Sequence, residues 1–161
     1  RKIYHLVKEY AGSHFREIER KSGLSTGSLQ YHLDYLAKQG LIKIQKEGKN
    51  TRYYPNNFSS QNKKIMALLR QKSVRDILLY VLMHDNCNHE QIVQSVRLSP
   101  STVSWHLKKL EVSGTILSRQ EGRKTHYCLA IDKNEITKLL IAYQESFLDS
   151  VVDNIVEMWD V

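Results

Sequence analysis

At 161 residues and a net charge of +7, the chain has room for one or two small domains. Residues 1–57 carry 11 basic and 5 acidic side chains, whereas residues 132–161 carry 2 basic and 7 acidic ones. This division favours a polyanionic partner for the body of the chain and another role for its last segment. Two cysteines without a CxxC spacing do not form a disulfide framework, which favours a reducing compartment.

No apolar run reaches the length of about 18 residues that a membrane-spanning helix needs. We therefore expect a cytoplasmic protein without a membrane partner for this segment. The sequence begins with Arg1, so it could be a fragment of a longer protein, and an upstream membrane anchor stays open as an alternative.

Apolar residues at helical spacing predict a short first helix over residues 3–10, which ends near Gly12. A second helix is expected from about His14, and Ser22 and Gly23 should close it. These two helices stand directly before a segment that occurs twice in the chain.

Residues 24–54 and 98–128 are copies of one segment, aligned without a gap at a constant offset of 74. Eleven of the aligned pairs are identical, which indicates one structural unit built twice. In each copy a serine, Ser25 or Ser99, should cap a helix at its start. A glycine, Gly40 or Gly114, stands where a left-handed residue should end that helix.

After each of these glycines, two short runs flank a charged turn that contains Gly48 or Gly122. Two short runs joined by such a turn predict a β-hairpin. Two helices, a capped third helix and a hairpin follow one another in the order of a winged helix. The predicted fold class is therefore mainly α with small β-hairpin wings (α+β), as two tandem winged helix-turn-helix domains plus a long C-terminal helix.

The expected organisation has four parts. They are a first winged helix over residues 1–57, a basic helical connector over 58–74, a second winged helix over 75–131 and a C-terminal helix over 132–161. Asp132 should cap the last helix, and an apolar residue recurs there every three or four positions. This stripe contains Ile136, Leu140, Tyr143, Phe147, Val151, Ile155 and Trp159. It predicts a homodimer seam, and the alternative is that the helix folds back on its own domain.

Two motifs carry a resemblance to a known family: HFREIERKSGLSTGSLQYHLDYLAKQGLI at 14–42 and LSPSTVSWHLKKLEVSGTI at 98–116. The chain resembles the winged helix-turn-helix transcriptional regulators, specifically the tandem-domain kind common in archaea. The second motif is also similar to the recognition helices of ArsR-type and MarR-type repressors. The resemblance covers nearly the whole chain and implies double-stranded DNA as partner and gene regulation as function.

The residues themselves agree with this implication, because a helix that enters the major groove reads bases near its N-terminus. Outward positions of the two expected recognition helices are Thr26, Ser28, Gln30 and Tyr31, and then Ser101, Thr102, Ser104, Trp105 and Lys108. The wings offer Lys46, Lys49 and Arg52, and then Arg119, Arg123 and Lys124, as candidates for phosphate or the minor groove. Asp34 departs from this pattern, since a carboxylate repels phosphate.

The rival hypothesis is a protein–protein adaptor built from tandem winged helices without base-specific DNA binding, which Asp34 and Trp105 favour slightly. A metal site near His84, Cys87 and His89 is a weaker hypothesis than a solvated loop, so we expect no metal and no other cofactor. The sequence holds no phosphate-binding glycine loop, nucleophile elbow or HExxH motif, and an enzyme is not expected.

Overall fold

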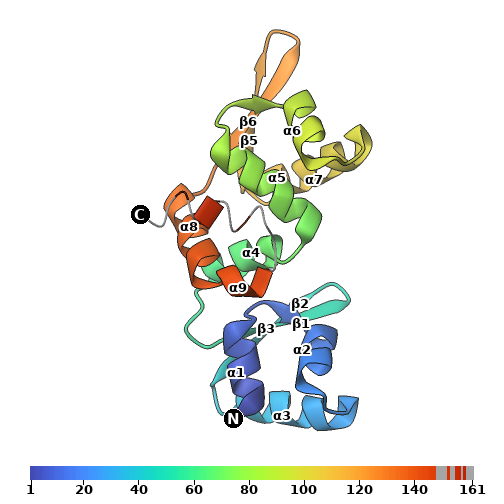
Figure 1. Ribbon diagram of the computed structural model, residues 1–161, viewed down its shortest axis with the longest axis vertical. Coiled ribbons are helices and arrows are strands. Elements are labelled where there is room, and N and C mark those ends of the chain that lie inside the picture. Colours follow the sequence, from blue (N-terminus) through green and yellow to red (C-terminus); the bar gives the residue numbers. More distant parts are fainter. Residues whose placement is uncertain (148–151, 153–154, 157, 159–161) are drawn as a thin grey trace. The chain divides into compact units, whose positions relative to one another are not determined.

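The computed structural model describes residues 1–147, 152, 155, 156 and 158, and the chain divides into two compact units (Figure 1). The first unit contains Arg1–Arg70 and takes in residues 145–147 from near the C-terminus. The second unit contains Gln71–Gln144 and the described residues from 152 onward. The division falls after Arg70, so the basic segment that we expected to connect the domains is shared between the units, with its helix in the first.

The first unit has the element order α1 (Lys2–Glu9), β1 (Ser13–His14), α2 (Phe15–Ser22), α3 (Thr26–Lys38), β2 (Ile42–Glu47), β3 (Asn50–Pro55) and α4 (Ser60–Leu69). Local sequence sets the ends of its helices. The Ser25 hydroxyl accepts a hydrogen bond from the Ser28 N–H at the start of α3. Gly23, with φ +70°, ends α2, and Gly40, with φ +73°, follows α3, so both stand in the left-handed conformation that glycine adopts without strain.

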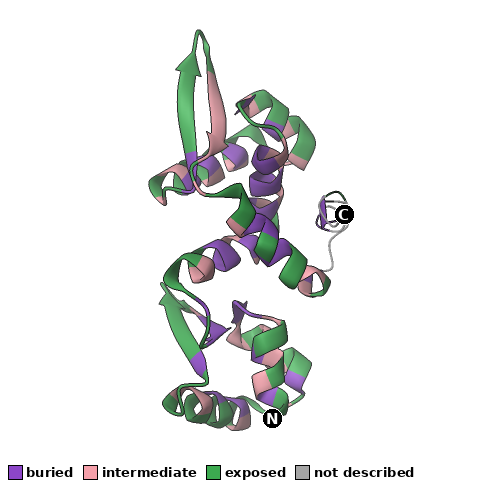
Figure 2. Ribbon diagram, turned by 90° about the vertical axis from the view of Figure 1, so that its left-hand side faces the viewer, coloured by how far each residue is buried: buried purple, intermediate pink, exposed green. Residues whose placement is uncertain are grey.

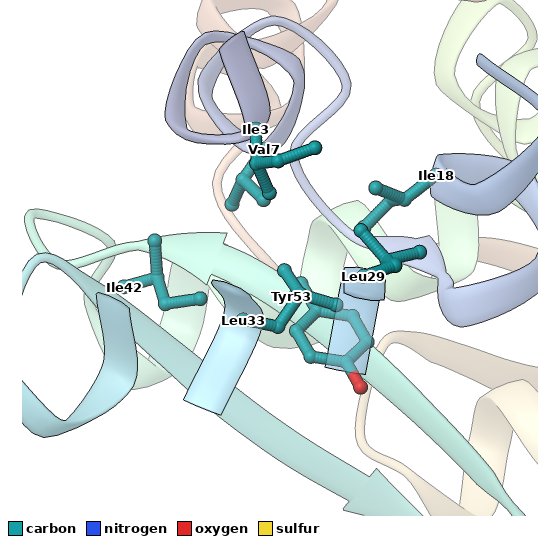
Figure 3. Packing of buried hydrophobic residues seen from close by; sticks show 7 residues of the cluster. All are labelled: Ile3, Val7, Ile18, Leu29, Leu33, Ile42 and Tyr53. Carbon is teal, nitrogen blue, oxygen red and sulfur yellow. The ribbon is translucent and has the colours of Figure 1, made fainter. Parts of the chain in front are cut away.

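The core of the first unit lies between its three N-terminal helices and the base of the hairpin. Figure 3 shows the buried cluster of Ile3, Val7, Ile18, Leu29, Leu33, Ile42 and Tyr53. These residues come from α1, α2, α3, β2 and β3, so one apolar cluster joins the three helices to both strands of the hairpin. Burial of such side chains is the main force that fixes α3 against the rest of the unit.

The predicted hairpins are present, and each belongs to a three-stranded antiparallel sheet. In the first unit the strand order is β1-β3-β2, with Glu47 opposite Asn50 across the tight turn. Gly48, with φ +56°, opens that turn. The two-residue strand β1 pairs with the other edge of β3, which makes β3 the central strand. The hairpin pattern in the sequence did not predict this third strand.

The second unit repeats the first: α5 (Lys72–Met83), β4 (Cys87–Asn88), α6 (His89–Val96), α7 (Pro100–Val112), β5 (Ile116–Glu121), β6 (Lys124–Leu129) and α8 (Lys133–Ala142). Asn88 and Gln91 form a full capping box at the start of α6. The sheet order β4-β6-β5 copies that of the first unit. Figure 2 shows β5 exposed along nearly its whole length, as the burial of its residues also records.

The structure corrects the prediction of one long C-terminal helix. Asp132 caps α8 as expected, but α8 ends at Ala142, and Tyr143 takes a non-helical conformation before the short helix α9 (Gln144–Phe147). Ile136 and Leu140 are fully buried within their own chain, so they are not available as a dimer seam. The alternative that the tail folds back on its own chain fits these residues.

The remaining stripe residues are placed as follows. Phe147 is buried in the first unit, where the Arg70 guanidinium stacks 4.7 Å from the centre of its ring. Ile155 is buried in the second unit. Tyr143 is half-buried, and Val151 and Trp159 lie outside the described residues. Phe147 and Ile155 are therefore excluded from a seam for the same reason as Ile136 and Leu140.

Candidate nucleic-acid interface

The N-terminal half of α3 presents a polar and aromatic surface to solvent. Thr26, Gln30 and Tyr31 are exposed, with 68% of Tyr31 accessible, while Ser28 is half-buried. The Thr26 hydroxyl donates a hydrogen bond to the Glu19 carboxylate on α2, which ties the start of α3 to the preceding helix. Three of the four predicted positions thus project outward, and Ser28 contributes mainly to the cap of the helix.

Asp34 forms a hydrogen bond with Gln30 on the exposed face of α3. The Gln30 amide nitrogen donates to the Asp34 carboxylate at 2.9 Å, one helical turn away. This contact holds the Gln30 amide in one orientation and uses one of its two donor hydrogens. Its carbonyl oxygen and second hydrogen stay available, which is the pair of groups that glutamine needs to contact adenine.

The first wing confirms two exposed cations and corrects a third. Lys46 and Lys49 are exposed on the hairpin. Arg52 is instead buried at 3% accessibility, where its Nε donates to the Glu47 carboxylate and its Nη1 to the Gly12 carbonyl, both at 2.8 Å. The prediction that Arg52 contacts DNA is therefore wrong, because this side chain is buried at the base of the wing and bonded there within its own unit.

The elements of the first unit meet around a pocket of about 440 Å³ beside the wing. Gln30 from α3 and Lys49 from the wing both line it, and so do His14 from β1 and Arg16 from the first turn of α2. Arg16 and His14 were not predicted as site residues. The signal that could have found them is their position at the start of α2, with His14 as its N-cap and Arg16 in its first turn, beside the free N–H groups of a helix N-terminus.

Helix α7 presents the corresponding surface in the second unit. Ser101, Ser104, Trp105 and Lys108 are exposed, and Thr102 is half-buried at the capped start of the helix. The Ser104 hydroxyl lies 2.9 Å from Nε2 of His89 on α6, so a contact to DNA has to share this hydroxyl.

Trp105 on α7 is exposed, with 58% of its area accessible. The Lys109 ammonium sits 4.2 Å above the centre of its ring, a cation–π contact that fixes the ring without burying it. Tyr31 occupies the aligned position on α3, so each unit shows one exposed aromatic ring at the same place of its third helix.

The second wing carries the three predicted cations in exposed positions: Arg119, Arg123 and Lys124. Arg119 also pairs with Glu121 at 3.3 Å, within the same wing. His126 stands at the position that aligns with Arg52 and faces the same glutamate position, with 3.5 Å between its Nδ1 and the Glu121 carboxylate. At the base of the second wing, a His126–Glu121 contact of 3.5 Å thus replaces the Arg52–Glu47 contact of 2.8 Å in the first wing.

The cysteine region does not gather metal ligands in the described part of the chain. Among those residues, no three His, Cys, Asp or Glu side chains come together. Cys87 is buried in β4, and this burial raises the pKa of its thiol to about 11. Its position is that of a small core residue. None of the described helices is long and apolar enough to cross a membrane.

Comparison with known families assigns each half of the chain separately. Residues 1–66 match a family model described as an N-terminal HTH domain. Residues 72–116 match the model of the bacterial regulatory proteins of the arsR family. The chain is a tandem helix-turn-helix protein. In this tandem helix-turn-helix protein the first match covers all of α1 to β3, and the second runs from α5 into β5.

A curated relative extends over both halves. This tandem helix-turn-helix protein is 32% identical over 129 residues to an uncharacterized HTH-type transcriptional regulator of Methanocaldococcus jannaschii. The match covers 79% of the chain but 32% of the relative. The chain thus spans about a third of the length of that regulator.

Proposed function

We propose that this chain is the DNA-binding part of a transcription regulator and that it recognises double-stranded DNA by sequence. In the proposed complex the N-terminal ends of α3 and α7 enter the major groove, and the wings contact the backbone or the minor groove. Both family matches and the curated relative support DNA-binding regulation as the class of function.

The observation that carries the proposal is the convergence of three elements beside the first wing. Gln30 from α3, Arg16 from α2 and Lys49 from the hairpin line one pocket. A side chain that can read a base edge therefore shares this pocket with two cations that can bind the adjoining phosphates, and the Glu17 carboxylate also lines it. This combination of one reader with flanking phosphate contacts is what a base-reading interface requires.

The two units should contribute unequally. Arg16 of the first unit aligns with Glu90 of the second, while Asp34 of α3 aligns with Lys108 of α7. We infer that the first unit holds phosphate mainly from α2 and its wing. The second unit would hold it mainly from α7 and its wing, where Lys108 and Arg123 are exposed.

Homodimerisation stays a prediction, but most described residues of the apolar stripe that the sequence suggested as its seam are buried within the chain. Ile136, Leu140, Phe147 and Ile155 are buried within the chain. A dimer would have to use other residues, such as the exposed Ile141. Sedimentation velocity of the wild type and of Ile141→Glu tests this directly. A dimer that the substitution dissociates would support Ile141 as a contact, and a monomer at all concentrations would contradict dimerisation.

The proposed function is tested by selection of bound sequences from random duplex DNA, followed by two matched substitutions. Gln30→Ala should relax the base preference at one position of the selected site. Lys49→Ala should weaken binding to all sequences alike, because phosphate contacts carry no base identity. If selection enriches no sequence while the chain captures a protein partner, the adaptor hypothesis replaces this proposal.

A further inference from the structure

The second unit contains a pocket of about 430 Å³ that lies away from α7 and the wing. It is lined by side chains from α5, from the end of α6 and from the C-terminal segment, where Ile155 contributes. This volume is within the range of small-molecule sites. The proposed DNA contacts of α7 and the second wing do not involve it.

The two repeats differ at positions that line this pocket. In the first unit the aligned positions carry two lysines with partners of their own. The Lys2 ammonium donates to the Ser22 carbonyl at 2.9 Å, and the Lys21 ammonium lies 4.0 Å above the centre of the Tyr10 ring. At the offset of 74, Lys2 becomes Asp76 and Lys21 becomes Ser95. Two long side chains are thus replaced by short ones.

Other changes between the repeats make the walls of this space apolar. Glu9 and Ser22 of the first unit align with Met83 and Val96 of the second, and both of the latter line the pocket. Leu79 and Ile155 add further apolar surface. These apolar walls suit a ligand with an apolar body.

Tyr80 and His84 add a flat wall. Their rings stack with centres 4.2 Å apart and planes 20° from parallel, and both residues line the pocket. The His84 ring is anchored through Nδ1, which lies 3.2 Å from the Tyr80 carbonyl. Such a rigid pair offers a fixed surface to an aliphatic chain or an aromatic ring.

Arg97 adds a charged group to the lining of the pocket. Its backbone has a conformation that arginine rarely adopts. It ends α6 with φ +58° and ψ +38°, the left-handed conformation that Gly23 takes at the aligned position of the first unit. Glycine would be the unstrained residue here, so the arginine side chain is retained at a cost in backbone strain. Its planar guanidinium suits a carboxylate, which it can bind through two parallel hydrogen bonds.

The other charged groups of the pocket compensate one another. Lys72 and Asp76 both line it, and the Lys72 ammonium lies 3.1 Å from the Asp76 carboxylate. Arg97 is exposed, and it forms no ion pair with any residue that the structure describes. The balance of charge therefore favours a ligand with one negative group.

We propose that this pocket, defined by Leu79, Tyr80, Met83, Val96, Arg97 and Ile155, binds a small monocarboxylate with an aliphatic or aromatic body. The carboxylate pairs with Arg97, and the body lies between the apolar walls and the Tyr80–His84 stack. Arg97 belongs to the turn between α6 and α7, so the ligand also biases how α7 is presented to DNA. That last step rests on the proposed function, whereas binding of the acid does not.

The first experiment follows the backbone amides of the whole chain by NMR during titration with octanoate and 3-phenylpropionate, with 1-octanol as the uncharged control. For ligands of this size we expect an acid to bind with a Kd of about 0.1–1 mM. The shifts should centre on Leu79, Val96 and Arg97, and 1-octanol should bind at least about tenfold more weakly. If neither acid gives saturable shifts at these amides by about 5 mM, the proposal is wrong.

Arg97→Gly is the decisive variant, because it installs the residue that the first unit carries at the aligned position. The substitution relieves the left-handed backbone, so the variant should fold and melt at a higher temperature than the wild type. Its affinity for octanoate should fall at least about tenfold while that for 1-octanol stays unchanged. Undiminished octanoate binding by this variant would overturn the role of Arg97 and the assignment of the ligand as an acid.

The effect on DNA is measured separately, with the duplex that selection yields. Octanoate should change the affinity of the wild type for this duplex and leave that of Arg97→Gly unchanged. An acid that binds without altering DNA affinity would contradict the regulatory step alone. Failure of the chain to bind any duplex would overturn the proposed function and leave the NMR result standing.

Discussion

Replacing Arg52 with alanine should destabilise the first unit without removing a contact to DNA. Arg52 donates to the Glu47 carboxylate and to the Gly12 carbonyl, both at 2.8 Å, from a side chain that is 4% exposed. A hydrogen bond from a charged group contributes about 1.5–3 kcal/mol. The Glu47 side chain is 43% exposed and regains water in the variant, so its bond counts for less. We expect a loss of about 2–4 kcal/mol in the free energy of unfolding.

The assay is urea unfolding followed by circular dichroism, with hydrogen exchange of the β3 amides to assign the loss to the first unit. Lys49→Ala is the matched control on the same wing, since Lys49 is exposed. It should leave stability within about 0.5 kcal/mol of the wild type and lower the salt slope of DNA binding by about 1. A stable Arg52→Ala variant with a reduced salt slope would refute this reasoning, because Arg52 would then be a phosphate contact after all.

Three further predictions concern stability and reactivity. Gly12→Ala should cost about 2 kcal/mol or more in thermal unfolding, because Gly12 has φ +86° and a Cβ would lie 2.9 Å from Met66 Cγ. Gly27→Ala, with no neighbouring atom within 4 Å, should stabilise α3 by about 0.5–1 kcal/mol, and equal effects of the two changes would contradict the structure. Burial chiefly raises the pKa of Tyr54 to about 12, so the folded state keeps a proton that the unfolded state loses above its pKa of 10.0. Stability should therefore fall as pH rises from about 10 to 12, a fall that Tyr54→Phe should reduce in alkaline denaturation curves. Cys87, whose pKa is raised to about 11, should react with iodoacetamide only after unfolding, and rapid labelling of the native protein in mass spectrometry would contradict its buried position.

The repeat in the sequence predicted the folded units because local signals and core pattern agree in both copies. Ser25 and Ser99 cap their helices as expected, and Gly40 and Gly114 take φ values of +73° and +75°. Caps and left-handed glycines act within a few residues of the chain, so they can be read from sequence alone. The capping box at Asn88 belongs to the same class of local signal.

Predictions that depended on distant parts of the chain were less successful. The stripe of Ile136 and Leu140 indicated correctly that one face of the helix is buried, but a periodic pattern does not say what covers that face. The prediction that Arg52 contacts DNA was wrong for a related reason. Its strand gains a second neighbour, β1, only two residues long, which is too short for any pattern to reveal. The segment that leads into β1 supplies the Gly12 carbonyl to which the buried Arg52 donates.

In the candidate site, too, local properties were predicted from the sequence and long-range packing was not. The sequence predicted correctly that three side chains are exposed on the hairpin and on one face of α3, because a place on a hairpin or on a helix face is a local property. These side chains are Lys46, Lys49 and Gln30. The approach of Arg16 to Gln30 and Lys49 depends on how α2, α3 and the wing pack together, and no spacing in the sequence encodes it. The pocket of the second unit likewise depends on how α5, α6 and the C-terminal segment pack together.

The central claim is that the chain binds duplex DNA through exposed cations and reads its sequence. The most direct test is the affinity of the whole chain for a duplex pool over a range of salt concentrations, with sequencing of the retained fraction. The account predicts a steep fall of affinity with salt, together with enrichment of a defined motif in the retained DNA. A shallow salt dependence with no enriched motif would contradict it.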